Sequence, residues 1–132
     1  MAHGSPVDED QYLLDARTAR TCFEGTDFAV CFFGHSHYPC CFTLESGRAA
    51  LTVARGADRV VFRLAPGRRY LINPGSVGQP RDANPNAAFV LFDSDARAIE
   101  VRRVAYDIAA AARKIFLAGL PPSNAYRLYL GR

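Results

Sequence analysis

An uninterrupted apolar run at residues 28–33 (Phe-Ala-Val-Cys-Phe-Phe) limits the folds open to this chain. A run this short with no polar residue is typical of a strand that is buried on both faces of a sheet. Gly34 follows at once, so the strand is expected to end there and to pass directly into a loop. The run therefore places a buried strand in the first quarter of the sequence.

Helices are expected at both ends of the chain, with short strands between them. Ser5 and Pro6, followed by acidic residues at 8–10, predict the start of a helix that ends at Glu24-Gly25. Asp107 is expected to cap a second helix that stops at Pro121-Pro122, with residues 123–132 left open. The expected strands are 40–44, 49–54, 59–64, 70–72, 87–93 and 98–106, with turns at 46–47 and 56–58. This order predicts a mixed α/β fold, with a mostly antiparallel sheet and helices on one face.

Length and composition narrow the function classes. The 132 residues fit one domain, and the net charge of +3 comes from scattered arginines, which gives no signal for nucleic acid. No apolar run approaches the roughly 20 residues of a membrane span, and no secretory signal opens the chain. The four cysteines lack the paired spacing of a zinc site, so they are expected to be packing residues in a reduced, cytoplasmic protein.

Three histidines are candidate metal ligands, because each lies within three residues of a glycine at the boundary of an expected element. His3 precedes the first expected helix, while His35 and His37 flank Ser36 immediately after the 28–33 strand. Neutral imidazole binds zinc, manganese, iron or nickel, and a metal at the end of a buried strand would be open to solvent, as hydrolysis requires. Taken alone, the His-Ser-His pattern is weak, and hydrogen-bonded surface histidines are the favoured alternative.

The loop at residues 73–81 (Asn-Pro-Gly-Ser-Val-Gly-Gln-Pro-Arg) is the second candidate site. Its small residues would expose backbone N–H groups to an anion, and Arg81 could hold a phosphate oxygen with its planar guanidinium. The phosphate-binding candidates are Asn73, Gly75, Ser76 and Arg81. An irregular loop with permissive glycines and a surface arginine explains the pattern about equally well.

Together, residues 3–6, 34–37 and 73–81 resemble, in order and spacing, the last motifs of calcineurin-like metallophosphoesterases, and most closely those of small bacterial predicted phosphodiesterases. The resemblance implies a two-sheet sandwich with flanking helices and a site for two divalent metals (Mn, Fe, Ni or Zn). It implies that His3 and His35 bind one metal and that His37 binds the other. A water activated by both metals would attack the phosphorus of a phosphomonoester or phosphodiester.

The same resemblance covers only the C-terminal portion of that family's domain, as residues 1–132. The family's Asp-X-His, Gly-Asp and Gly-Asn motifs are absent, so this chain alone is expected to bind metal weakly and to be nearly inactive. The 28–33 strand would leave an apolar edge, so pairing is expected with a separately encoded N-terminal half or with a second copy. One simple hypothesis is a truncated chain, or a start assigned at an internal methionine. Two alternatives are a non-catalytic scaffold of the same fold and an unrelated binding module, which the 73–81 loop disfavours.

Overall fold

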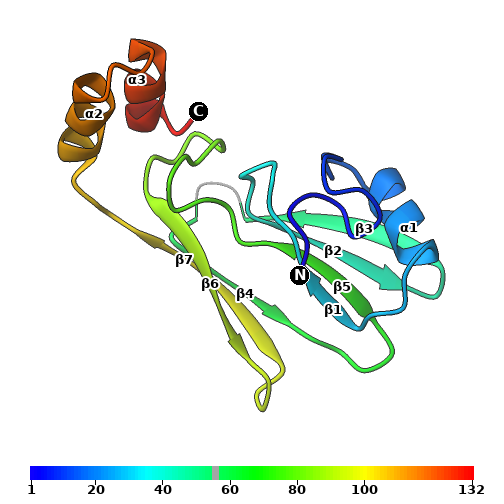
Figure 1. The fold of residues 1–132 in the computed structure, drawn as a ribbon. Coiled ribbons are helices and arrows are strands. Elements are labelled where there is room, and N and C mark those ends of the chain that lie inside the picture. Colours follow the sequence, from blue (N-terminus) through cyan, green and yellow to red (C-terminus); the bar gives the residue numbers. More distant parts are fainter. Residues whose placement is uncertain (55–56) are drawn as a thin grey trace.

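Two packed β-sheets make the body of the protein, with one helix on the outer face of the first sheet and a helical pair at one end (Figure 1). The computed structural model describes residues 1–54 and 57–132. The elements in chain order are α1 (Ala16–Glu24), β1 (Val30–Phe32), β2 (Cys40–Glu45), β3 (Arg48–Val53), β4 (Arg59–Arg63), β5 (Arg69–Asn73), β6 (Ala87–Asp93), β7 (Ala98–Val104), α2 (Ile108–Leu117) and α3 (Pro122–Leu130). The expected mixed α/β class is confirmed. Part of the turn expected at 56–58 lies outside the described residues.

The first sheet has the strand order β1-β5-β2-β3, and β1 pairs with β5 in parallel while the other pairs are antiparallel. Its two faces bury different clusters. Leu13, Phe23 and Phe42 lie in the cluster between this sheet and α1. Tyr70, Ile72 and Ile99 lie in the cluster between the two sheets. The strand predicted at 28–33 therefore forms at the edge of a sheet that is covered on both faces.

The second sheet has the order β4-β7-β6 and is antiparallel throughout. Its strands alternate between inward and outward residues, as expected for a sheet with one solvated face. Ile99 and Val101 are buried against the first sheet, whereas Val61 and Leu91 are more than 40% exposed on the other face.

The start of the first helix is corrected by the structure. Residues 5–15 form an irregular segment, and α1 begins only at Ala16, where the Asp15 carboxylate accepts a hydrogen bond from the Thr18 N–H. The Ser5 hydroxyl accepts from the N–H groups of Val7 and Asp8, which closes a local turn instead of a helix. A serine side chain offers its neighbouring backbone this alternative, so a capping pattern does not by itself start a helix.

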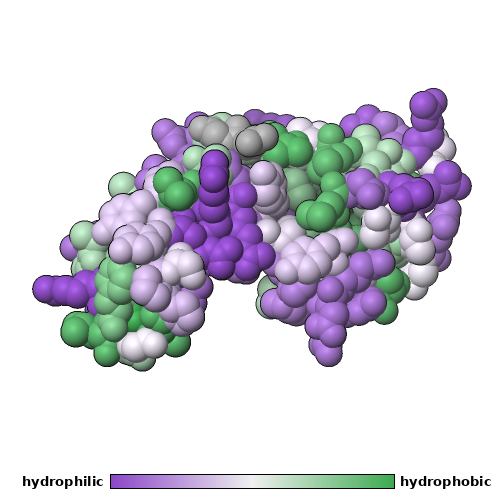
Figure 2. Space-filling model, turned by 90° about the horizontal axis from the view of Figure 1, so that it is seen from above, coloured by the Kyte–Doolittle hydropathy of each residue, from purple (hydrophilic) through white to green (hydrophobic). Residues whose placement is uncertain are grey.

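The C-terminal helices follow more closely from the sequence. The Asp107 carboxylate accepts from the Ala110 N–H at 2.8 Å, which confirms the predicted cap of α2. The undecided tail forms α3, which packs against α2 and ends at Gly131 in the left-handed conformation. The pair lies at one end of the body, where the Ala83 N–H donates to the Gly131 carbonyl, and apolar residues gather on its surface (Figures 1 and 2). None of the described helices has the length and apolar character that crossing a membrane requires.

Candidate metal centre

Three loops meet at one end of the first sheet. Because β1 and β5 are parallel, the loops that follow them, residues 34–39 and 74–86, leave the same edge of the sheet. The N-terminal residues reach the same place. The Ala2 N–H donates to the Phe32 carbonyl at 2.9 Å, and the Gly34 N–H donates to the His3 carbonyl at 2.7 Å. These two bonds hold His3 alongside the end of β1.

His3 and His35 form a close pair. His3 Nε2 and His35 Nδ1 are 2.9 Å apart, and the two rings meet edge to face with their centroids 4.7 Å apart. Two nitrogens that bind one metal at about 2.1 Å, roughly at a right angle, would be about 3 Å apart. An octahedral metal fits this separation, whereas two ligands of a tetrahedral site would be about 3.4 Å apart, and 2.9 Å is also the length of a hydrogen bond between the two ring nitrogens.

His37 lies on the same loop but has a different partner. Its Nδ1 lies 2.9 Å from the Gln79 carbonyl oxygen, which requires the Nδ1–H tautomer and leaves Nε2 to act as an acceptor or ligand. Histidines that bind metals commonly hold their second ring nitrogen in this way. Burial holds the pKa of His37 below its usual value, against the opposing effect of the hydrogen bond to Gln79. The neutral form is the one that binds metals.

The loop that carries both histidines has an unusual backbone. His35 and His37 have φ angles of 62° and 59°, in the left-handed region that few non-glycine residues occupy. Between them Ser36 is buried, and its N–H donates to the Gly34 carbonyl at 2.7 Å. The backbone therefore turns tightly at two ligand candidates, and the buried Ser36 lies at its centre.

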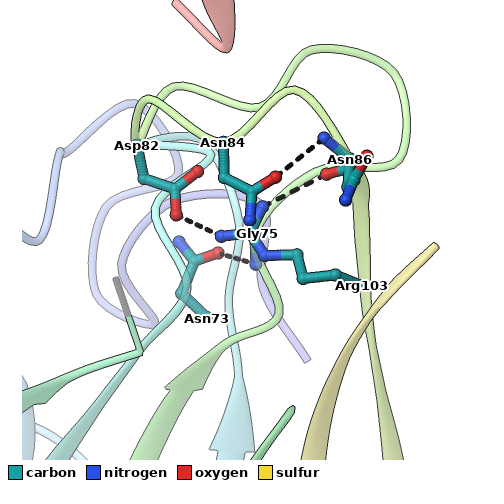
Figure 3. A network of polar contacts seen from close by, with 6 residues as sticks. All are labelled: Asn73, Gly75, Asp82, Asn84, Asn86 and Arg103. Atoms are coloured by element: carbon teal, nitrogen blue, oxygen red, sulfur yellow. Dashed lines mark hydrogen bonds and ion pairs between the residues drawn. The ribbon is translucent and has the colours of Figure 1, made fainter. Parts of the chain in front are cut away.

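Asn73 joins this loop to the next one. Its side chain is buried, and its Nδ2 donates to the Gly34 carbonyl and the Ser36 hydroxyl at 2.8 and 2.9 Å. Its Oδ1 accepts from the Gly75 N–H at 2.9 Å (Figure 3). The structure thus uses the amide of Asn73 and the N–H of Gly75 to brace the two loops against each other.

The remaining phosphate-binding candidates lie farther along the second loop. The Ser76 hydroxyl accepts from the N–H groups of Gly78 and Gln79, which shapes a turn. The Arg81 guanidinium donates to the Gln79 side chain at 3.1 Å, so Gln79 contacts both Arg81 and His37. Gly75 has a φ of 86°, and a Cβ on it would lie 2.7 Å from the Ala88 Cβ, so only glycine fits there.

Sequence reasoning missed two features of this end of the molecule. The first is a fully buried ion pair between Asp82 and Arg103, in which Arg103 of β7 also donates to the Asn86 carbonyl at 3.2 Å (Figure 3). The second is the ring of Tyr12, which lies over His35 with the centroids 4.0 Å apart. No motif spacing marks either contact, because each joins residues that only the tertiary fold brings together.

The candidate ligands are thus a close pair, His3 and His35, and the single residue His37. Within residues 1–54 and 57–132, no three or more His, Cys, Asp or Glu side chains are grouped so that they could hold a metal ion.

The four cysteines are free and buried, and burial raises the pKa of Cys40 to about 12 and of Cys41 to about 11. Both thiols are therefore protonated and unsuited to metal binding at neutral pH.

Comparison with known proteins supports the resemblance drawn from the sequence. No family model matches the chain. Its structure superimposes on a metallophosphoesterase from Sphaerobacter thermophilus with a TM-score of 0.91 and 37% identity, over 99% of this chain and 54% of that one. This similarity supports the resemblance to the calcineurin-like metallophosphoesterase superfamily.

Other similar proteins are consistent with this metallophosphoesterase fold. An uncharacterized protein of Methanocaldococcus jannaschii is 43% identical over 101 residues, which are 76% of this chain and 39% of that protein. A hypothetical protein of Pyrococcus horikoshii shares the fold, with a TM-score of 0.63 and 20% identity over 99% of this chain and 45% of the other. The chain thus spans about half the length, or less, of the proteins it matches. The expected two-sheet architecture of the family is confirmed.

Proposed function

We propose that this chain contributes one side of the active site of a metal-dependent phosphoesterase, which hydrolyses phosphomonoesters or phosphodiesters. The observation that carries the proposal is the His3–His35 pair, whose ring nitrogens are 2.9 Å apart at the end of the first sheet. The similarity in structure to a metallophosphoesterase over almost the whole chain supports it.

Each candidate residue has a definite task in this proposal. His3 and His35 would together hold one divalent ion (Mn, Fe, Ni or Zn), and Nε2 of His37 would bind a second. Such metals lower the pKa of a coordinated water and neutralise charge on the phosphoryl oxygens. The Gln79 carbonyl fixes the tautomer of His37, and Asn73 holds the two loops together.

The loop after β5 would bind the phosphoryl group. The Arg81 guanidinium is the chain's candidate for a two-point contact with phosphate oxygens. It is already oriented by Gln79, and the hydroxyl of Ser76 lies in the same loop. Since this loop and the histidine loop are braced by Asn73, phosphate and metals would be held in fixed relation.

Further ligands would come from outside these 132 residues, because three imidazoles cannot saturate two metal ions. We propose that carboxylate ligands are supplied by a preceding segment of polypeptide or by a separate chain, in the cytoplasm, and that the 132 residues alone have little activity. Such a segment would join at the outer edge of β1, opposite β5. Among the described residues, Ala2 and His3 form hydrogen bonds at the end of this edge.

The test is manganese-dependent hydrolysis of bis(p-nitrophenyl) phosphate and p-nitrophenyl phosphate. The 132-residue chain is assayed beside a version extended at its N-terminus through the upstream reading frame. We expect activity in the extended protein, and we expect chelation to abolish it. Extended protein that is inactive with both substrates and with Mn, Fe, Ni and Zn would refute the proposal and favour a non-catalytic scaffold.

A His35→Gly variant of the extended protein tests the ligand assignment. Glycine is used because it tolerates the left-handed backbone at this position, where alanine would add strain. Arg97→Gly is the matched control, because Arg97 has a φ of 48° in the exposed turn between β6 and β7. We expect loss of a ligand to lower kcat/KM by more than about 100-fold, beyond what losing an outer hydrogen-bond partner does, and the control to match wild type.

A further inference from the structure

Tyr12 belongs to neither of the two hydrophobic clusters of the described residues. Its neighbour Leu13 is 1% exposed in the cluster beneath α1, and this fixes the backbone at the end of the irregular segment. The side chain of Tyr12 itself remains 46% exposed. Its ring contacts the ring of His35, at a centroid distance of 4.0 Å and a tilt of 41°.

His35 is consequently held between two rings. Tyr12 covers it with a tilted stack, and His3 meets it edge to face at 4.7 Å and 65°. Aromatic pairs at such distances have preferred relative orientations, which add to the stabilisation from the area they bury. The stack therefore restrains the plane of an imidazole that hangs on a tight surface loop.

The plane of this ring decides which nitrogen faces His3. In the structure Nδ1 of His35 points at Nε2 of His3. A rotation of the His35 ring about its side-chain bonds would turn Nδ1 away and leave His3 without a partner. Metal affinity depends on such preorganisation, since the cost of ordering a ligand is subtracted from the binding free energy.

We propose that Tyr12 is a positioning residue that holds the His35 imidazole in the orientation needed for the His3–His35 ligand pair. The ring carries this role and the hydroxyl does not, because the contact joins the two rings, which are tilted by 41°. The metal-binding consequence rests on the function proposed above, whereas the orientation of His35 does not.

The chain offers a well-matched set of variants. Tyr12→Leu and Tyr12→Gln remove the aromatic ring, and Tyr12→Phe keeps it without the hydroxyl. Tyr129→Leu is the control, because Tyr129 is 49% exposed and belongs to α3, outside the three loops. Substitutions at positions this exposed seldom unfold a protein, and circular dichroism verifies that each variant retains its helices and strands.

The first measurement is made without metal, by NMR of the ring protons. In wild type and in Tyr12→Phe we expect a nuclear Overhauser effect between the His3 and His35 rings, with ring-current-shifted His35 protons. Both signals are expected to be lost in Tyr12→Leu and Tyr12→Gln. A His3–His35 contact that persists in those two variants overturns the inference, and so does its loss in Tyr12→Phe.

The second measurement is titration of the chain with Zn²⁺ by calorimetry, with His35→Gly as reference. We expect Tyr12→Leu to weaken binding about 10- to 100-fold, the range found for residues that support metal ligands, and Tyr12→Phe and Tyr129→Leu to bind as wild type. Wild type that binds no better than His35→Gly would count against the proposed metal site alone, and the NMR result would still decide the role of Tyr12. Wild-type affinity in Tyr12→Leu would overturn the positioning role.

Discussion

The two sheets of this protein differ in how they are covered, and the candidate site follows that difference. The first sheet is buried on both faces, by α1 and by the second sheet, and the loops after its strands β1 and β5 carry the candidate ligands and Arg81. The second sheet has one solvated face and contributes to this end chiefly through Arg103. A site that needs fixed geometry is thus built on the sheet that packs against other elements on both of its faces.

The widest contrast should come from two phenylalanines, one from each sheet. Phe42 of β2 is completely buried, whereas Phe92 of β6 is 49% exposed and meets Phe32 at 5.9 Å. We expect Phe42→Ala to lower the free energy of unfolding by about 3–5 kcal/mol, and Phe92→Ala to lower it by only about 1 kcal/mol. Urea denaturation measures both, and equal losses would contradict the unequal roles of the sheets.

The ion pair between Asp82, in the loop after β5, and Arg103 of β7 is tested by removing the arginine. Arg103→Ala leaves Asp82 buried without its partner and should destabilise the protein by about 3 kcal/mol. Arg102→Ala, the next residue along β7, removes an exposed pair with Glu100 and should cost less than about 1 kcal/mol. If the two variants unfold at the same urea concentration, the second sheet does not anchor the 74–86 loop in this way.

The hydrogen bonds of Asn73 between the two loops should contribute less to the free energy of unfolding than to the local order of the loops. Asn73→Ala removes the hydrogen bonds to Gly34, Ser36 and Gly75, and it should destabilise the protein by about 2 kcal/mol. Because the Gly75 N–H loses its acceptor, its hydrogen exchange should accelerate more than that of residues in β2. Asn124→Ala on α3 is the control, and uniform acceleration across the first sheet would instead indicate global unfolding.

The smallest effect is expected on the solvated face of the second sheet, in acid. Hydrogen bonds from Arg59 and Arg102 lower the pKa of Glu100 to about 2 from its ordinary 4.5. The contribution of this carboxylate to stability is therefore present above pH 4.5 and is lost as the pH falls toward 2. Thermal midpoints of wild type and Glu100→Gln should differ by a constant amount above pH 5 and converge near pH 2. Parallel curves over that range would rule out this pairing.

Most of the strands were predictable, because each is a short apolar or alternating run with turn residues at its ends. The parallel pairing of β1 with β5 was not predicted, since residues 30–32 and 70–72 are separated by three other strands. The false helix start at Ser5 shows the limit of local patterns. The same hydroxyl that can cap a helix here closes a turn, and Asp15 is the true cap.

The site was predictable only as a set of segments. Gly-His-Ser-His and the 73–81 loop are two segments that the fold brings together, but their local sequence could not assign a task to each residue. Asn73 was expected to bind phosphate, and it lies buried between the two loops. Whether His3, His35 and His37 bind metal stays a prediction. The contact of Tyr12 with His35 depends on the path of an irregular segment, for which the sequence carries no periodic signal.

The last residues of the chain offer a position for a fluorescent label. A Cβ at Gly131 would lie 2.7 Å from the backbone of Asn84, and the Ala83 N–H donates to the Gly131 carbonyl at 3.0 Å. The C-terminus is therefore fastened to the loop that carries Arg81, far from it in sequence. A fluorophore attached at Arg132 would sit beside that loop, so its emission could report phosphate capture without a label inside the site.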